Sequence, residues 1–163
     1  MFMNLKIYSL WAVLLISVAA HAAPEPGMEE AQLVPSGSVA VEQAWIRVAG
    51  EDAVMQPAYM ILKSTANTPW SLDKVTARGF RMVMIHRVVL QDSETRMALQ
   101  DTLTIPPGET IAMNDKSYHL MFMGPRKDYK DGDKISVVLY FRDQKPVKMI
   151  FPVLKRAPRL TAK

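Results

Sequence analysis

The chain has 163 residues, no cysteine, and 20 Lys and Arg against 16 Asp and Glu, which gives a formal net charge of +4. This length suggests one domain. The positive balance is too small to indicate a nucleic-acid-binding surface, and the aromatic and basic ladder that binds single strands is absent from the sequence. With no cysteine, a thiolate metal site is excluded.

The first 22 residues have the pattern of an export signal. Lys6 supplies the positive charge, Ile7–Ala19 form an apolar run, and Ala20–Ala22 fit a cleavage site with small residues at both ends. The apolar run is too short for a stable transmembrane anchor, and no cysteine lies near the cut to carry a lipid. We therefore expect a soluble protein that is exported to the periplasm.

The segments on either side of the central region have the composition of loose chain. Residues 23–38 combine prolines and glycines with polar residues, which predicts a flexible leader. Residues 155–163 form a basic tail with one proline, which we also expect to be loose. The folded domain is therefore predicted to span residues 39–154.

Within residues 39–154, short strands alternate with turn residues, and the segment contains no stretch of helical period long enough for a helix. Turn chemistry occurs at residues 66–69, 106–108, 131–133 and 142–146. Many short strands at this density predict an all-β sandwich or barrel. The predicted strands are Val39–Val48, Ala58–Ser64, Leu72–Thr76, Arg81–Leu90, Arg96–Leu99, Glu109–Met113, Tyr118–Met123, Lys134–Phe141 and Lys148–Leu154.

Alternation along two of these strands groups histidine with methionine. Side chains two residues apart lie on the same face of a strand, so His86 shares a face with Met84. In Tyr118–Met123 the same rule places His119 with Met121. These two side chains can therefore bind one ion from a single strand.

The candidate metal ligands are His86, Met97, His119 and Met121. Ten residues separate the first two, 21 separate the next two and one separates the last two. Beyond the signal the chain has only these two histidines, and both belong to the pattern. Thioethers are soft and uncharged, so the set favours Cu(I) over zinc and can release its ion to a partner. A blue-copper site is excluded, because it requires a cysteine thiolate.

The other methionines have a structural interpretation as well as a chemical one. Methionine most often fills gaps in a core. Those that alternate with aliphatic residues are predicted to be core residues, and two that share a face with the histidines are predicted to be either packing neighbours or spare ligands. The predicted core residues are Met60, Met82, Met113 and Met149, and the two neighbours are Met84 and Met123.

The spacing His86-x10-Met97-x21-His119-x-Met121, with the segment Tyr118–Gly124, resembles the signature of the PCuAC family of periplasmic copper chaperones. The resemblance extends over residues 39–154. Its further segments are Ala44–Arg47, Ala58–Met60, Ile105–Gly108 and Asp131–Asp133.

This resemblance implies a cupredoxin-like or immunoglobulin-like Greek-key β-sandwich that binds one Cu(I) near its surface. It implies that His86, Met97, His119 and Met121 are the four ligands of that ion. It also implies that the copper passes, alone or with a Sco-type protein, to the CuA centre of cytochrome c oxidase. We expect a monomer that is not an enzyme and binds no nucleic acid.

The sequence departs from the family pattern at three places. Arg87 follows the first histidine, but alternation directs it to the opposite face. Thr95 stands where relatives often have another methionine, and Asn114–Ser117 replace a segment that is usually rich in glycine. The tail after residue 154 has neither histidine nor methionine, so a second copper site there is not expected.

Two alternatives remain open. If the signal were cut after Ala20, His21 would become the N-terminal residue and could form a copper brace of the kind found in oxidative polysaccharide-cleaving enzymes. The sandwich could instead be a metal-independent interaction module. Other enzyme classes lack support, because the sequence contains neither a Gly-x-Ser-x-Gly elbow nor a His-Glu-x-x-His motif.

Overall fold

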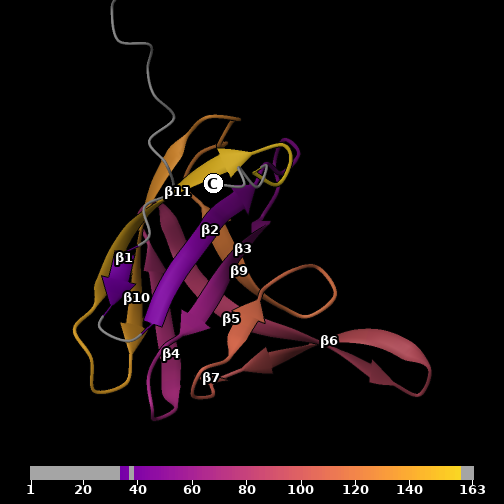
Figure 1. Cartoon of the computed structure of the whole chain (residues 1–163). Helices are drawn as coiled ribbons and strands as arrows, with labels where there is room; N and C mark the ends of the chain where they lie inside the picture. Colours follow the sequence, from indigo (N-terminus) through magenta and orange to yellow (C-terminus); the bar gives the residue numbers. More distant parts are fainter. Residues whose placement is uncertain (1–33, 37–38, 159–163) are drawn as a thin grey trace, which may run out of the picture.

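The computed structural model describes residues 34–36 and 39–158. These residues form eleven β-strands (Figure 1), which confirms the predicted all-β sandwich. Among them, no helix is long and apolar enough to cross a membrane. The strands are β1 (Val34–Ser36), β2 (Val39–Arg47), β3 (Met55–Ser64), β4 (Trp70–Ala77), β5 (Phe80–Gln91), β6 (Glu94–Gln100), β7 (Leu103–Ile105), β8 (Thr110–Ala112), β9 (Tyr118–Pro125), β10 (Lys134–Phe141) and β11 (Val147–Leu154).

The hydrogen-bonded order of the strands is β6-β5-β9-β3-β2-β11-β10-β4-β7, with β1 beside β2 and β8 beside β3. All pairs are antiparallel except β11 with β2, which is parallel. The path folds over into two layers, and the hydrophobic core lies between them (Figure 1). Strand β9 contributes Leu120 and Phe122 to this core, and β10 contributes Val137 and Leu139.

A tight turn joins β5 to β6 and sets their register. Asp92 and Ser93 both have positive φ, at 51° and 66°, as in a two-residue type I′ turn. The turn is closed by the pair Gln91 and Glu94, so that Val88 lies opposite Met97. The resulting hairpin projects from the body of the sandwich (Figure 1).

All nine predicted strands are present, Lys134–Phe141 with the predicted ends and the other eight with shifted ends, and two further strands were missed. Each missed strand has three residues, Val34–Ser36 and Leu103–Ile105, and pairs with a longer neighbour, β2 or β4. Segments this short carry no readable alternation, so the neighbouring strand rather than local pattern defines them. Val34–Ser36 lies inside the span predicted to be a flexible leader, and this part of it is instead a paired strand.

The predicted ends of the chain are only partly described. The signal at residues 1–22, with His21, lies outside the described residues, as do residues 159–163 of the tail. The start of that tail is fixed, because the backbone N–H of Lys155 donates a hydrogen bond to Oδ1 of Asp131 at 2.9 Å.

Three of the four methionines predicted for the core are there. Met60, Met113 and Met149 are buried in it. The prediction for Met82 is wrong, because this side chain is 49% exposed. Met82 lies on the outer face of β5, which the second layer of the sandwich does not cover, whereas the neighbouring Val83 packs against the core.

Met149→Ala is expected to lower the free energy of unfolding by roughly 2–5 kcal/mol, because it leaves a cavity in the core. Met82→Ala is the matched control and should cost less than about 1 kcal/mol, since this side chain is half exposed. Urea denaturation of both variants measures the difference. Equal losses in the two variants would contradict this assignment of the core.

Candidate metal centre

His86 of β5 and His119 of β9 lie directly opposite each other in the antiparallel ladder. Their ring centroids are 5.6 Å apart, with an angle of 83° between the ring planes. Both side chains are on the outer face of the sheet, because the adjacent pair, Ile85 and Leu120, points into the core. His119 is nevertheless only 3% exposed, and His86 is half-buried.

Met121 extends this pair along β9. It lies two residues from His119, opposite Met84 of β5, and is 7% exposed. A histidine pair is therefore followed by a methionine pair on the same face. Alternation predicted the grouping within each strand, and the structure supplies the pairing between the strands.

Met97 shares this face but lies further from the histidine pair. On β6 the residue opposite His86 is Leu99, and Met97 is opposite Val88. Met97 is therefore a diagonal neighbour of His86. Such neighbours are about 7–8 Å apart, within reach of a long side chain. The side chain is 63% exposed, so the structure brings three of the predicted ligands close together and places the fourth at the open edge of the group.

The two histidines each carry a buried ring nitrogen without a partner. Nδ1 of His86 and Nδ1 of His119 are both buried, and neither atom takes part in a hydrogen bond. Buried polar atoms in native proteins are nearly always hydrogen-bonded, so two such exceptions in one cross-strand pair require an explanation. A bound metal ion is one, because a neutral imidazole binds a metal through its unprotonated nitrogen.

The surroundings keep both imidazoles in the neutral form that a metal requires. Burial lowers the pKa of His86, and burial followed by the charge of His86 lowers the pKa of His119. The backbone of Ser117 and the charge of Asp115 partly oppose the shift in the pKa of His119.

Other donor types are missing from this part of the molecule. Within residues 39–158 the side chains of His, Asp and Glu form no group of three or more that could hold a metal ion. The chain also has no cysteine, so the soft donors next to the histidine pair are the thioethers of Met84, Met97 and Met121. Arg87 adds no charge to the face that carries the histidines. Its guanidinium lies over the ring of Tyr118, 5.3 Å from the centroid, and alternation had predicted that Arg87 points away from that face.

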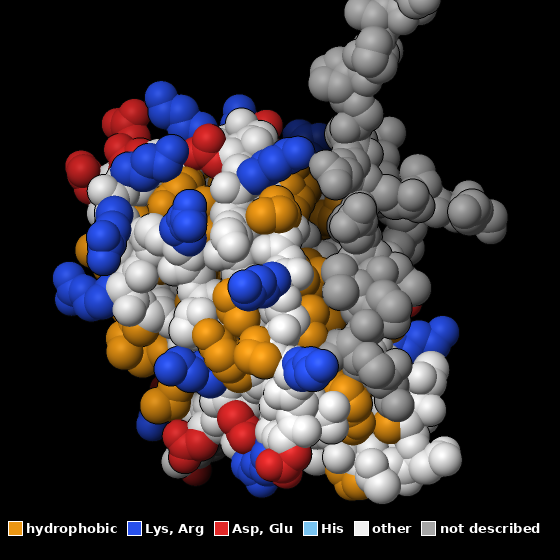
Figure 2. Space-filling view, turned by 90° about the vertical axis from the view of Figure 1, so that its left-hand side faces the viewer, with side chains coloured by type: hydrophobic (Ala, Val, Ile, Leu, Met, Phe, Trp, Pro, Cys, Tyr) orange, Lys and Arg blue, Asp and Glu red, His pale blue; other side chains and the backbone are white. Residues whose placement is uncertain are grey.

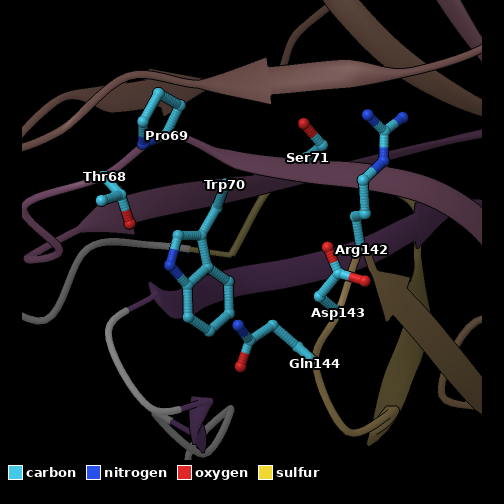
Figure 3. A pocket seen from close by; sticks show the side chains of 7 residues that line it. All are labelled: Thr68, Pro69, Trp70, Ser71, Arg142, Asp143 and Gln144. Carbon is cyan, nitrogen blue, oxygen red and sulfur yellow. The ribbon is translucent and has the colours of Figure 1, made fainter.

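The opposite layer offers a small pocket of a different kind (Figure 3). It is a polar hollow beside the start of β4 and the turn between β10 and β11, and it contains neither histidine nor methionine. Arg142 at its rim is already paired, since Nε donates to Oδ2 of Asp73 at 2.9 Å. The face shown in Figure 2 has Lys and Arg side chains spread among hydrophobic ones, and no histidine is visible on it. The residues that line the pocket are Thr68, Pro69, Trp70, Ser71, Arg142, Asp143 and Gln144.

One methionine of the outer face was not identified from the sequence. Met55 belongs to β3 and lies opposite Met123 of β9, whereas the predicted strand began three residues later, at Ala58. Pro57 inside the run hides the true start, because proline weakens a strand pattern. The sequence carried no clear signal, because the inward position next to Met55 is occupied by a polar residue, Gln56, which is buried.

Comparison with known proteins gives a family and a fold. The family model "Putative lipoprotein LpqE-like" matches residues 39–153. The "Putative lipoprotein Lxx21020" of Leifsonia xyli subsp. xyli (strain CTCB07) is 26% identical over 143 residues, which cover 87% of this chain and 85% of that protein.

Two similar solved structures are of copper-bound proteins. The "Copper-bound PCuAC domain from PmoF2" has a TM-score of 0.65 and 21% identity, covering 76% of this chain and 97% of that one. CuI-DR1885 from Deinococcus radiodurans has a TM-score of 0.58 and 21% identity, covering 77% and 83%. The fold expected from the resemblance to PCuAC proteins is therefore confirmed.

The metal-free protein is expected to lose stability as the pH falls below about 6.5, the ordinary pKa of histidine. Because the pKa values of His86 and His119 are lowered in the folded state, the unfolded chain binds protons first and the free energy of unfolding decreases. The loss continues until the pH reaches the folded-state pKa values. Urea denaturation between about pH 8 and about pH 5 measures this slope.

The variant His119→Gln tests the cause of this slope. It removes one of the two imidazoles, so the free energy of unfolding should depend less steeply on pH. Asp73, whose pKa is lowered mainly by its hydrogen bond with Arg142, titrates at more acidic pH and should not contribute. A slope unchanged in His119→Gln would show that the histidine pair is not its cause.

Proposed function

Because this chain belongs to the LpqE-like family and shares its fold with copper-bound PCuAC domains, we propose that it is a Cu(I) carrier rather than an enzyme. The proposed ligands are His86, Met97, His119 and Met121. The observation that supports this most directly is the cross-strand histidine pair, in which both buried Nδ1 atoms lack a partner.

The donor set fits the proposed cargo. Two imidazoles and two thioethers carry no charge, and thioethers prefer Cu(I) to the harder divalent ions. The low polarity around His119, which keeps the ring neutral, disfavours ions that need charge neutralisation by carboxylates. A single Cu(I) would be held chiefly between β5 and β9, with Met97 closing the site from β6.

The position of the site suits transfer to a partner. The four proposed ligands belong to the outer face of the sheet, so an acceptor could approach without unfolding of the core. Met97 is the most exposed of the four, which makes it the ligand that an incoming donor atom would replace first.

We propose that the carrier acts outside the cytosol, in the periplasm, and delivers copper to the CuA centre of cytochrome c oxidase, alone or with a Sco-type protein. The export pattern of residues 1–22 and the description of the relatives as lipoproteins support an exported protein. The 163 residues contain no cysteine, so a thioether-linked lipid has no attachment residue within them. Transfer of Cu(I) to a purified CuA domain, with and without a Sco-type protein, tests the choice of acceptor.

The proposed ligands predict strong effects on copper affinity. His119→Ala and Met121→Ala should each weaken Cu(I) binding at least about tenfold, the loss seen when even an outer partner of a metal ligand is removed. Competition with a Cu(I) chelator under ascorbate measures the affinity. Met149→Leu in the core is the matched control and should bind normally, and Zn(II) should not displace the copper.

Normal copper binding by His119→Ala, or equal affinity for Zn(II) at neutral pH, would contradict the site. Absence of any Cu(I) binding to the unmodified protein under reducing conditions would favour the metal-independent interaction module.

Oxidation by peroxide tests the role of Met97 separately. In the metal-free protein Met97 should be oxidised to the sulfoxide well before Met121, because its side chain is 63% exposed and that of Met121 only 7%. One equivalent of Ag(I), a redox-stable soft ion, should protect Met97 while leaving the exposed Met55 and Met82 reactive. Peptide mass spectrometry reports each residue. If Met97 is still oxidised by peroxide when Ag(I) fully occupies the first site, Met97 is not a ligand.

A further inference from the structure

Three methionines on adjacent strands lie in one row of the sheet. Met123 of β9 is directly opposite Met55 of β3 on one side and directly opposite Met82 of β5 on the other. This row uses none of the ligands proposed above. It is the third step of a ladder along β5 and β9, after the pair His86 and His119 and the pair Met84 and Met121.

The row lies on the outer face, and the backbone holds it in place. The neighbouring residues Gln56 and Phe122 point the other way and are buried. At the edge of the row, the N–H of Gly124 donates to the carbonyl of Val54 at 2.9 Å, which continues the β3–β9 contact beyond the last paired residues. The three methionines therefore sit side by side whether or not an ion is bound.

The thioethers of this row are available to solvent. Met55 is 43% exposed and Met82 is 49% exposed, and Met123 between them is half-buried. Most large exposed apolar side chains of residues 39–158 lie on the same face, which is unusual for a surface with no function. Those on this face are Met55, Met82, Leu90, Met97 and Leu99.

The geometry of a three-stranded row suits a single small ion. Directly opposite residues have Cβ atoms about 4.5–5.5 Å apart, and methionine has three rotatable bonds with which the outer two sulfurs can turn toward the middle one. The row contains no carboxylate or imidazole. Three uncharged thioethers select a soft monovalent ion over zinc, magnesium or calcium.

We propose that Met55, Met82 and Met123 form a second soft-metal site, which binds Cu(I) or Ag(I). Met123 lies four residues along β9 from His119 and two from Met121, which is about 14 Å and about 7 Å at about 3.4 Å per residue, so an ion among the three methionines lies apart from an ion at the histidine pair. The row lacks imidazole and fills after the histidine site. Met121, a ligand of the first site, and Met84 opposite it lie between the histidine pair and the row, so soft donors continue from one site to the other and an ion can pass along them.

Titration with Ag(I) of protein labelled with 13C at its methionine methyl groups tests this site. The first equivalent should shift the methyl signals of Met97 and Met121, and the second should shift those of Met55, Met82 and Met123. In a parallel chelator competition, Met82→Leu and Met123→Leu should each abolish the second equivalent of Cu(I) and leave the first unchanged. Leucine preserves volume and hydrophobicity, so the fold is retained and the amide spectrum verifies it.

Two controls separate this proposal from the proposed function. Met113→Leu, a core substitution, should leave both equivalents unchanged, and His119→Ala should remove the tight equivalent while the methyl shifts of the row persist. The second site is disproved if the three methyl signals stay in place with excess Ag(I), or if the leucine variants keep the second equivalent. Binding at the row with no effect of His119→Ala on the tight equivalent would support this site and overturn the histidine site.

Discussion

The antiparallel register of β5 against β9 is the constraint on which the outer face depends. Side chains alternate with a period of two, so a slip of one residue would turn the histidines of one strand into the core and move core residues outward. The register is secured from the inner side, where Ile85 pairs with Leu120 and Val83 with Phe122. Packing between the layers therefore determines which polar atoms meet on the opposite face.

The same arrangement explains why polar groups can be buried on an outer face. Trp45 and Tyr59, whose ring centroids are 5.1 Å apart, fill the outer side of β2 and β3, and His119 lies one strand further on. Burial raises the pKa of Tyr59 and lowers the pKa of His119, and the charge of Asp115 adds to the first shift and opposes the second. The histidine pair thus sits at the border between a covered and an open part of the sheet. Leaving two imidazole nitrogens unpaired there costs stability in the metal-free fold, and local costs of this kind concentrate at functional sites.

Sequence reasoning predicted the faces of the strands but not their partners. Alternation within one strand correctly grouped His119 with Met121, because that relation is local. The pairing of His86 with His119 spans two strands that are distant along the chain, and only the three-dimensional packing supplies it. Met82 and Met149 show the limit most clearly: both alternate with aliphatic residues, yet only Met149 faces the other layer.

The parallel pairing of β11 with β2 has a consequence for how the chain folds. Strand β11 lies between β2 and β10, with Val153 opposite Ile46 and Leu154 opposite Arg47, so the last strand joins the beginning of the domain to its end. Contacts between such distant segments form slowly, because a long loop must close before they contribute any stability. A chain that is still being synthesised lacks β11 until residues Val147–Leu154 have been made. The sandwich therefore cannot be completed before the whole domain has been synthesised.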